Sequence, residues 1–504
     1  MHDPESLKLR PAPLEMGPED FRARGHETVD RIADFLSTLA SRPVTRGESP
    51  SELRRLLRDS SLPAHGLPAR SLLEETAALL FEHSLFNGHP RFWGYITSSA
   101  APIGALGDLL AATVNPNVGS SVLAPIATEI EAQTVRWIAE LMGYPAGSGL
   151  LVSGGNMANF VCFVAARRAK APWHVREAGM NAEGAVRLRV YASKETHTWI
   201  QKAADLFGLG TDAIRWIETD RDLRMDTVAL RRTIAADRVA GDLPFLVVGT
   251  AGSVSTGAVD PLGEIAAIAA QENMWFHVDG AYGALAAVLP GASADLKALS
   301  LADSVAVDPH KWLYAPLEAG CALVRDREAL RDAFSYHPPY YHFNSNPEDE
   351  PTNYYELGPQ NSRGFRALKV WLALRQVGRA GYERMIEDDC RLARALFDLV
   401  SRDEELEAFT QALSITTFRY VPADLRATAA DHAEYLDTLN TELVGRLQKG
   451  GEAFVSNAVI GGRFVLRACV VNFRTRLSDI EALPGIVVRL GREVDAQMRP
   501  GRNS

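Results

Sequence analysis

Cysteine, positive charge and long apolar runs are scarce in this sequence, and each scarcity excludes a class of protein. The 504 residues include 4 cysteines that lie far apart, with no CxxC pair and no spacing suited to zinc, as is typical of free thiols in a reducing compartment. Lys and Arg total 53 against 63 Asp and Glu, so the net charge of −10 provides no overall attraction to nucleic acid or to an anionic membrane surface. The longest apolar stretches, such as residues 283–289, are far shorter than the roughly 18 residues that a membrane helix needs.

The remaining composition is that of a globular chain. Hydrophobic residues make up 46% of the sequence, which is enough for a large core, and the length predicts two or three domains. Positions 1–21 carry acids and prolines where a secretory signal peptide would need an apolar segment. We therefore expect a soluble, cytoplasmic protein that acts on a small molecule and has neither a nucleic-acid nor a membrane partner.

Three regions of the chain differ in pattern. Residues 1–89 are predicted to form an N-terminal helical arm, because apolar residues recur at helical spacing over residues 21–40 and breaker-rich segments follow. The arm is too thin for a core of its own and is expected to pack on another subunit or another part of the chain. Residues 90–385 form the predicted large domain, and residues 386–504 a small C-terminal α+β domain. The elements predicted for the small domain are strands at residues 414–420 and 464–473 and helices at residues 430–448 and 477–498.

The large domain has an alternating pattern. Short β-rich runs each precede a loop and a helix-like segment, as expected for βαβ units. The predicted fold class is therefore α/β, with a mostly parallel sheet and helices on both of its faces. The predicted strands are residues 188–192, 245–249, 274–278 and 304–307.

Three loops of this domain carry polar side chains that could act together. The run WFHVDGAY at residues 275–282 is a buried strand followed by a loop, and its acid is Asp279. The run SVAVDPHKW at residues 304–312 is a strand whose next turn presents Lys311, and GGNMAN at residues 154–159 opens a helix. Ligands of open α/β sheets bind beyond the carboxyl ends of the strands, so all three loops are expected on one rim.

This combination matches the needs of pyridoxal phosphate. A lysine amine forms a Schiff base with the aldehyde, a carboxylate keeps the pyridine nitrogen protonated, and the N–H groups of a helix start hold the phosphate. Each feature alone has a plainer interpretation: Lys311 as a surface residue, Asp279 as a helix N-cap, and residues 154–155 as a turn. His277 and Asp279 share one face of a strand and could imitate a metal pair, but no third ligand stands nearby and no metal site is predicted.

Two motifs identify a family resemblance. DPHKW at residues 308–312 and HVDGAY at residues 277–282 resemble the pyridoxal-phosphate-dependent group II amino acid decarboxylases, which include the aromatic-L-amino-acid, histidine and glutamate decarboxylases. The resemblance extends from FRARG at residues 21–25 to RALKVW at residues 366–371 and beyond. It implies a type I aminotransferase-like fold with a seven-stranded-type central sheet, and a homodimer with active sites at the subunit interface.

The matching motifs imply the site residues. Lys311 resembles the Schiff-base lysine, Asp279 the partner of the pyridine nitrogen, and His197 the histidine that stacks over the cofactor ring and faces the substrate carboxylate. Cofactor binding is implied for five further residues, namely Gly155, Asn156, Ser253, Asp308 and His310.

Three of these positions depart from the family pattern. The family commonly has serine at the position of Asn156 and often has asparagine at that of Asp308, and a carboxylate beside a phosphate is repulsive unless neighbours neutralise it. Two hydroxyl residues often stand together in the loop where this chain has Ser253 followed by Val254. Which hydroxyl of residues 250–256 contacts the cofactor is therefore open.

Proline and acid density mark residues 336–351 as a long loop. The resemblance implies a catalytic loop here, with a tyrosine that protonates the α-carbon of the substrate after carbon dioxide leaves. Tyr340 matches best and Tyr341 is the alternative, while a surface loop with packing aromatics is the plainer interpretation. Relatives that make aldehydes often replace this tyrosine with phenylalanine, so Tyr340 favours simple decarboxylation.

The sequence indicates the substrate-binding residues less clearly than the cofactor-binding ones. The run PRFWGYIT at residues 90–97 resembles the pocket-lining segment of aromatic amino acid decarboxylases, so Trp93, Tyr95 and Thr97 are candidates for substrate binding, together with His197. Large aromatic residues such as Trp93 are more often part of a core or an interface. Residues 115–122 of the partner subunit are expected to approach the same pocket. They are small or polar here, whereas aromatic-specific relatives often carry bulky aromatic residues in this segment.

The predicted function is decarboxylation of an L-amino acid, with a lean toward an aromatic one, to the amine and carbon dioxide. Oxidative decarboxylation–deamination to an aldehyde and transamination are the alternative reactions. A non-catalytic regulator that binds pyridoxal phosphate is the alternative class of protein. The joint presence of Lys311, Asp279, His197 and Tyr340 argues against that class.

Overall fold

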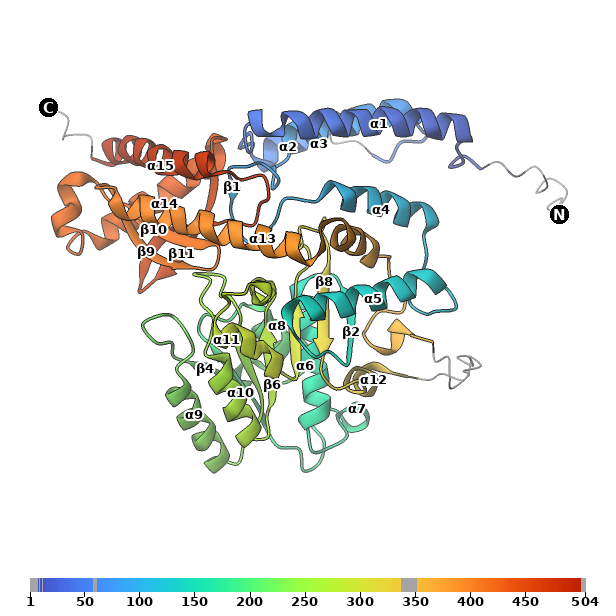
Figure 1. The fold of residues 1–504 in the computed structure, drawn as a ribbon, viewed down its shortest axis with the longest axis vertical. Helices are drawn as coiled ribbons and strands as arrows, with labels where there is room; N and C mark the ends of the chain where they lie inside the picture. Colours follow the sequence, from blue (N-terminus) through green and yellow to red (C-terminus); the bar gives the residue numbers. More distant parts are fainter. Residues whose placement is uncertain (1–7, 9, 11, 58–60, 337–350, 500–504) are drawn as a thin grey trace.

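A seven-stranded sheet forms the centre of the large domain (Figure 1). The computed structural model describes residues 8, 10, 12–57, 61–336 and 351–499. The strand order is β2-β8-β7-β6-β5-β3-β4, in which β8 is antiparallel to both neighbours and all other pairs are parallel. The strands are β2 (Ser148–Val152), β3 (Leu188–Ser193), β4 (Ile214–Ile217), β5 (Leu243–Thr250), β6 (Trp275–Asp279), β7 (Ser304–Val307) and β8 (Gly320–Val324).

The predicted α/β fold class is confirmed. All four predicted strands are present, as β3, β5, β6 and β7. Helices cover both faces of the sheet. The helices of this region are α5 (Pro125–Met142), α6 (Gly155–Lys170), α7 (Val175–Ala178), α8 (Trp199–Leu206), α9 (Thr227–Val239), α10 (Leu262–Gln271), α11 (Ala294–Lys297) and α12 (Ala329–Phe334).

Neighbouring residues of one strand belong to different cores. Leu246 and Val248 of β5 pack with Phe163 of α6 in one core. Val247, between them, belongs to the core on the other face, together with Ile265 of α10. Because both faces of the sheet are covered, its strands are apolar at successive positions rather than alternating with polar residues.

A five-stranded sheet forms the centre of the C-terminal region, in the order β1-β11-β12-β10-β9. The predicted helix at residues 477–498 is confirmed as α15, and the one at residues 430–448 is present as α14, displaced by a few residues. The predicted strand at residues 464–473 is present as β12 but already ends at Cys469. The chain then turns at Asn472. The side chain of this residue donates to the carbonyl of His89 at 2.8 Å and accepts from the backbone N–H of Arg474 at 3.0 Å. The elements are β1 (Phe92–Trp93), β9 (Leu406–Ala412), β10 (Ile415–Tyr420), β11 (Phe454–Ile460), β12 (Arg463–Cys469), α14 (Ala433–Gly450) and α15 (Leu477–Met498).

Helix α13 (Ala367–Arg402) connects the two sheets (Figure 1). It packs against α4 (Pro102–Val114) and α5 of the large domain and against β9, β10 and α15 of the C-terminal region. Its helical geometry is interrupted at Gly378, whose φ of +67° is a conformation that glycine adopts without a steric cost. The predicted division between residues 385 and 386 falls inside this helix, so α13 is shared by both regions.

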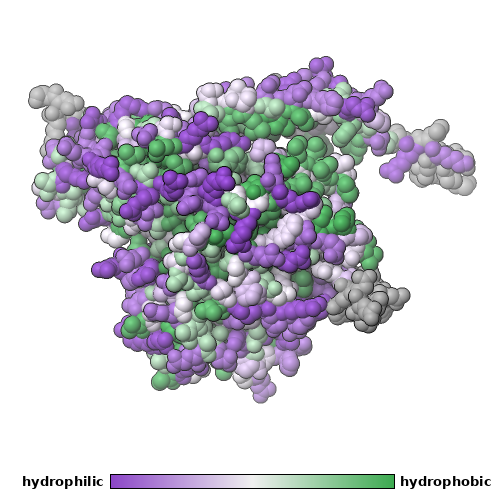
Figure 2. All heavy atoms as spheres, viewed as in Figure 1, coloured by the Kyte–Doolittle hydropathy of each residue, from purple (hydrophilic) through white to green (hydrophobic). Residues whose placement is uncertain are grey.

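The N-terminal arm consists of α1 (Pro18–Thr38), α2 (Pro50–Leu57) and α3 (Ala69–His83), and α4 (Pro102–Val114) follows it. The predicted helix at residues 21–40 is α1, which begins at Pro18 because proline suits the first turn of a helix. No side chain of α1 is buried, and apolar side chains gather between α1 and α4 on the molecular surface (Figure 2). Within the described ranges, no helix is both long enough and apolar enough to cross a membrane.

Candidate active site

A cavity of about 320 Å³ lies at one edge of the seven-stranded sheet. Strands β2 and β7 are both antiparallel to β8, so β2 ends at the same edge as the parallel strands β3, β5, β6 and β7. Residues that terminate or follow these five strands form the cavity wall. They are Ser153, Gly155, Asn156, Asn159, Glu195, His197, Thr250, Gly252, Val254, Asp279, Ala281, Tyr282, Asp308, His310 and Lys311.

Lys311 lies in the turn after β7 and is paired with an acid of the same turn. Its Nζ is 3.0 Å from Oδ2 of Asp308, and the Asp308 side chain is only 4% exposed. The other carboxylate oxygen, Oδ1, is buried and has no hydrogen-bond partner in the part of the chain that the structure describes. The wall therefore carries an amine next to a buried, incompletely bonded carboxylate.

The first turn of α6 lies against this carboxylate. Gly154, with φ of +91°, caps the helix, and a Cβ atom on Gly155 would come within 2.8 Å of Asp308 Oδ2. Only glycine fits this approach. The first N–H groups of a helix have no partner within the helix and favour an anion, so the Gly155–Asn156 segment can hold a phosphate.

Asp279 ends β6 and is fixed by a tryptophan. The indole N–H of Trp199 donates to Asp279 Oδ2 at 2.7 Å, and the backbone N–H of Ala281 donates to Oδ1 at 3.3 Å. The carboxylate is buried but lines the cavity, so it can meet a positively charged or protonated group of a ligand there.

A chain of hydrogen bonds supports β6 from behind the cavity wall. The indole N–H of Trp275 donates to Ser304 Oγ at 2.8 Å, Ser304 Oγ lies 2.8 Å from His277 Nδ1, and His277 Nε2 lies 2.7 Å from Asn159 Oδ1. Burial lowers the pKa of His277 to about 4, so the ring is neutral at neutral pH. Both ring nitrogens of His277 are engaged in this chain, which argues against the metal pair with Asp279.

Comparison with known proteins agrees with this geometry. A family model described as the pyridoxal-dependent decarboxylase conserved domain matches residues 50–421. The chain is 33% identical over 483 residues to an aromatic-L-amino-acid decarboxylase of Bacillus atrophaeus, covering 95% of this chain and 97% of that protein. It is 32% identical over 468 residues to tryptophan decarboxylase 1 of Oryza sativa subsp. japonica, with 90% of each chain covered.

The chain belongs to the pyridoxal-dependent decarboxylase family. Among solved structures, a crystal structure of Oryza sativa TDC with PLP and tryptamine aligns with a TM-score of 0.88 at 30% identity, covering 96% of this chain and 99% of that one. A crystal structure of mouse CSAD aligns with the same TM-score at 28% identity, covering 94% and 99% of the two chains. The protein is thus an amino acid decarboxylase whose cofactor is pyridoxal 5′-phosphate, on the predicted fold.

The cavity of this decarboxylase fits its cofactor. The N-terminus of α6 suits the phosphate, Asp279 suits the ring nitrogen, and Lys311 suits the aldehyde. Three residues of the wall each carry a buried oxygen that has no hydrogen-bond partner among the described residues. These oxygens are Thr250 Oγ1, Glu195 Oε2 and Asp308 Oδ1, and a polar ligand can satisfy them.

His197 follows β3 and lines the decarboxylase cavity, as the resemblance implied. Its Nδ1 accepts a 3.3 Å hydrogen bond from the backbone N–H of Trp199. Burial, partly opposed by the charge of Asp279, lowers the pKa of His197. Because Trp199 also holds Asp279, one turn after β3 positions both groups.

Ser253 does not reach the cavity, although its neighbours Gly252 and Val254 line it. The side chain of Ser253 is buried and lies 2.9 Å from Thr256 Oγ1. Thr250 lines the cavity instead, which distinguishes it among the hydroxyl residues of positions 250–256 that the sequence left open. Thr250 directly follows the predicted strand at residues 245–249, and in the structure it is the last residue of β5 and pairs in register with Asp279 of β6.

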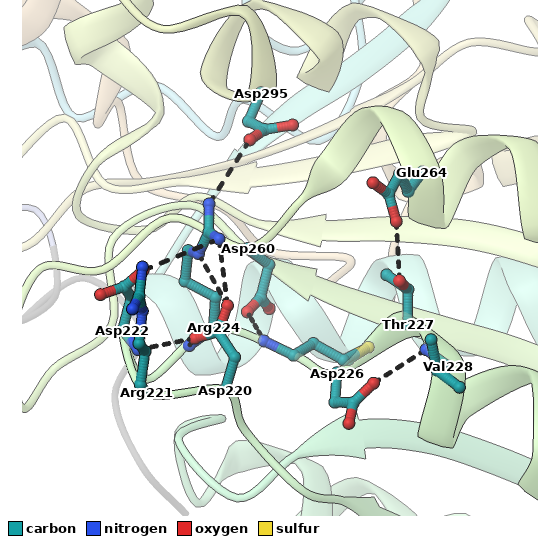
Figure 3. Close-up of polar contacts among 11 residues, drawn as sticks. Asp220, Arg221, Asp222, Arg224, Asp226, Thr227, Val228, Asp260, Glu264 and Asp295 are labelled. Atoms are coloured by element: carbon teal, nitrogen blue, oxygen red, sulfur yellow. Dashed lines mark hydrogen bonds and ion pairs between the residues drawn. The ribbon is translucent and has the colours of Figure 1, made fainter.

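A buried acid behind the wall holds Thr250 in place. Asp260 accepts from the backbone N–H of Thr250 at 2.8 Å through Oδ2, and from the backbone N–H of Met225 at 2.7 Å through Oδ1. Figure 3 shows Asp260 beside the loop that carries Arg224 and Asp226. Burial raises the pKa of Asp260 to about 6, although both hydrogen bonds act in the opposite direction. Asp260 therefore joins the end of β5 to the loop that precedes α9.

Of the predicted substrate residues, His197 lines the cavity, whereas Tyr95 and Thr97 lie outside it in the described protomer. The Tyr95 side chain is 56% exposed and packs against Phe454, with ring centroids 6.1 Å apart. Thr97 Oγ1 is buried without a hydrogen-bond partner among the described residues. The next residue, Ser98, donates to the carbonyl of His310 at 2.7 Å, so this segment is attached to the lysine turn. Tyr340 and Tyr341 lie outside the described residues.

The lysine turn is also attached to α13. Asp389 of α13 accepts from the indole N–H of Trp312 at 3.0 Å and from the hydroxyl of Tyr314 at 2.7 Å. Trp312 stacks on Tyr282 with ring centroids 4.7 Å apart, and the Tyr282 hydroxyl lies 2.6 Å from Ser414 Oγ, just before β10. The loops that carry Lys311 and Asp279 are thus held by residues from the C-terminal part of the chain.

Asp389 makes stability depend on pH. Burial raises the pKa of Asp389 from 3.8 to about 7, so the folded protein binds this proton more tightly than the unfolded chain. The stability contributed by the neutral carboxyl is present at low pH and is lost as the pH rises through about 7. We expect the thermal midpoint of Asp389→Asn minus that of the parent protein, both measured by circular dichroism, to increase between pH 5 and pH 8.

The matched control is Asp388→Asn, because the side chain of Asp388 is 53% exposed. Its thermal midpoint should follow that of the parent protein at every pH. Parallel profiles for Asp389→Asn and the parent protein would contradict the assignment.

Proposed function

We propose that this protein decarboxylates an aromatic L-amino acid to the corresponding amine and carbon dioxide, as a cytoplasmic homodimer. The observation that carries the catalytic assignment is the convergence of Lys311, Asp279 and the α6 N-terminus on one cavity. The aromatic substrate is supported by the relatives that match nearly the whole chain, an aromatic-L-amino-acid decarboxylase and a tryptophan decarboxylase.

The residues of the cavity divide the binding of the cofactor between them. Lys311 Nζ is the group that holds the aldehyde carbon, and the α6 N-terminus binds the phosphate. Asp279, fixed by Trp199, keeps a proton on the ring nitrogen. When bound, pyridoxal 5′-phosphate supplies an electron-withdrawing ring that accepts the electron pair left by departing carbon dioxide.

His197 and Tyr340 act on the substrate side in this proposal. The lowered pKa of His197 leaves a neutral imidazole at neutral pH, which stabilises the substrate carboxylate less than an imidazolium would. Weak stabilisation of the carboxylate favours its loss as neutral carbon dioxide. Tyr340 then delivers a proton from its hydroxyl to the α-carbon, and Lys311 assists release of the amine.

An aldehyde product is the second candidate function. Phenylacetaldehyde synthases of a Rosa hybrid cultivar and of Arabidopsis thaliana are 28% and 30% identical to this chain over 465 residues. The presence of tyrosine at position 340 favours the amine.

The cytoplasmic location rests on the cysteines. All four are free thiols, and three of them, Cys162, Cys321 and Cys469, are buried. A chain that keeps its thiols unpaired suits a reducing compartment.

The first prediction from the proposed function concerns Lys311. We expect the protein, supplied with pyridoxal phosphate and a pool of amino acids, to form an aromatic amine and an equal amount of carbon dioxide, identified by mass spectrometry. Lys311→Ala should reduce this turnover by several orders of magnitude, because the covalent anchor is lost. Lys297→Ala is the matched control, because Lys297 lies away from the cavity and bonds to the carbonyl of Pro290. Turnover by Lys311→Ala at the parent rate would refute the scheme.

The second prediction concerns the protonating residue. Tyr340→Phe should lower amine formation by about 10²- to 10⁴-fold, the usual contribution of a positioned general acid. Aldehyde should increase relative to amine in the same reaction. Tyr341→Phe serves as the matched control and should retain the amine. If the two variants exchange these outcomes, Tyr341 is the acid.

The homodimer is supported by an apolar face on α4. Gly104 and Gly107 turn one side of α4 toward Pro316 and Lys369, while the leucines of the opposite side are half exposed. Val122, Leu123 and Ile126, at and just after the end of the segment predicted to approach the partner's cavity, are exposed as well. A contiguous apolar surface of this kind marks an interface. Its residues are Leu106, Leu109, Leu110, Val114, Val122, Leu123 and Ile126.

The third prediction tests this interface. Leu109→Glu should shift the sedimentation coefficient from that of a dimer to that of a monomer, because a charge would be buried without a partner. Turnover should fall in parallel, since each cavity is completed by the other subunit. Leu301→Glu, at an equally exposed leucine on another face, should remain dimeric. A parent protein that sediments as a monomer while turning over substrate would disprove the proposal.

A further inference from the structure

Asp308 places a buried negative charge at the end of the cavity that binds phosphate. Its backbone N–H donates to the carbonyl of Ala281 at 3.1 Å, so the residue is held between the loops after β6 and β7. The carboxylate touches the first turn of α6, since a Cβ atom on Gly155 would lie 2.8 Å from Oδ2. Asp308 therefore lies beside the N-terminus of α6, where the phosphate is also expected to bind.

Lys311 is the cation that balances this charge. The groups that face the Asp308 carboxyl are Lys311 at 3.0 Å and His310 Nε2 at 3.7 Å, with the N-terminus of α6 on the other side. His197 and Asp279 line the same cavity. The negative charges of Asp279 and Asp308 raise the pKa of His197, whereas burial, the largest influence, lowers it. Asp279 adds further negative charge to the wall.

His310 does not neutralise Asp308. Its Nδ1 lies 2.6 Å from the carbonyl oxygen and 3.3 Å from the backbone nitrogen of Ala319, so Nδ1 is engaged away from Asp308 and only Nε2 faces the carboxylate, at 3.7 Å. Burial is the largest influence on the pKa of His310 and lowers it, so the imidazole is uncharged at neutral pH. The charge balance of Asp308 thus depends on Lys311.

Cofactor binding weakens this balance. As an ammonium, Lys311 Nζ carries three N–H donors, whereas a nitrogen bonded to the aldehyde carbon would carry at most one, so less of its hydrogen bonding would be available to Asp308. At the same time the phosphate brings a second anion to the α6 N-terminus, beside a carboxylate whose Oδ1 already has no partner among the described residues. Two adjacent anions in a buried site are unfavourable, and a proton on one of them removes the repulsion.

We propose that Asp308 takes up one proton when the cofactor binds and then donates a hydrogen bond from its carboxyl group to the phosphate. The inference rests on the proposed function, which assigns the α6 N-terminus and Lys311 to the cofactor. A neutral carboxyl supplies one O–H donor where the amide that the family often has at this position supplies two N–H donors, and it does so only after a proton arrives. Cofactor affinity in this protein therefore decreases as the pH rises.

Proton uptake can be counted by calorimetry. Enzyme freed of cofactor is titrated with pyridoxal 5′-phosphate at pH 8 in two buffers of different ionisation enthalpy, and the difference in heat gives the protons bound per cofactor. The parent protein should take up about one proton more than Asp308→Asn. Its dissociation constant should rise by up to about tenfold per pH unit relative to that of the variant, as linkage to one proton requires.

The controls separate this linkage from other titrations. Asp295→Asn removes a half-exposed carboxylate away from the cavity and should bind the parent number of protons. Asp308→Ser, a second uncharged variant, should behave like Asp308→Asn and keeps the test available if one of them folds poorly. An analogue without the aldehyde, pyridoxine 5′-phosphate, should show a smaller difference between parent and variant, because Lys311 can then stay with Asp308.

The outcomes distinguish the inference from the proposed function. Equal proton uptake by the parent protein and both Asp308 variants, with the cofactor bound and the amine formed, would overturn the role of Asp308 alone. Failure of the parent protein to bind the cofactor would overturn the cofactor assignment of the cavity and the inference with it.

Discussion

Backbone hydrogen bonds hold β3, β5, β6 and β7 parallel, and the whole site depends on this alignment. Parallel strands end at a common edge, so His197, Thr250, Asp279 and Lys311 meet although they are spread over 115 positions of the chain. β8 extends the constraint, because its antiparallel pairing on both sides turns β2 back to the same direction. The α6 N-terminus is thereby delivered to the same edge as the lysine.

The strands and the principal groups could be predicted because they depend on local patterns. Apolar runs bounded by loops located β3, β5, β6 and β7, and the resemblance of two short motifs singled out Lys311 and Asp279. The pairing of β8 between β2 and β7 could not be predicted, since periodicity shows that a strand exists but not which strand it joins. Gly320 fits there only because it lacks a side chain: a Cβ atom would lie 2.5 Å from the backbone of Gly154.

Side-chain competition explains what else escaped prediction. Ser253 carried the expected hydroxyl, yet Thr256, three residues later, takes its hydrogen bond, and Thr250 lines the cavity instead. The acids that position the site, Asp260 and Asp389, are separated from it in sequence and belong to no motif. Each is recognisable only when the fold shows which N–H and O–H groups it accepts from.

The attachment of the lysine turn to Asp389 and Ser414 has a consequence for the order of folding. Synthesis runs from the N-terminus, so Lys311 and its turn leave the ribosome before the residues that anchor Trp312, Tyr314 and Tyr282. The large sheet is complete at Val324, but the turn that carries the amine has its full set of contacts only after β10 has formed. A nascent chain ending between these points would have its central sheet without a fixed lysine, and capture of the cofactor would follow docking of the C-terminal region.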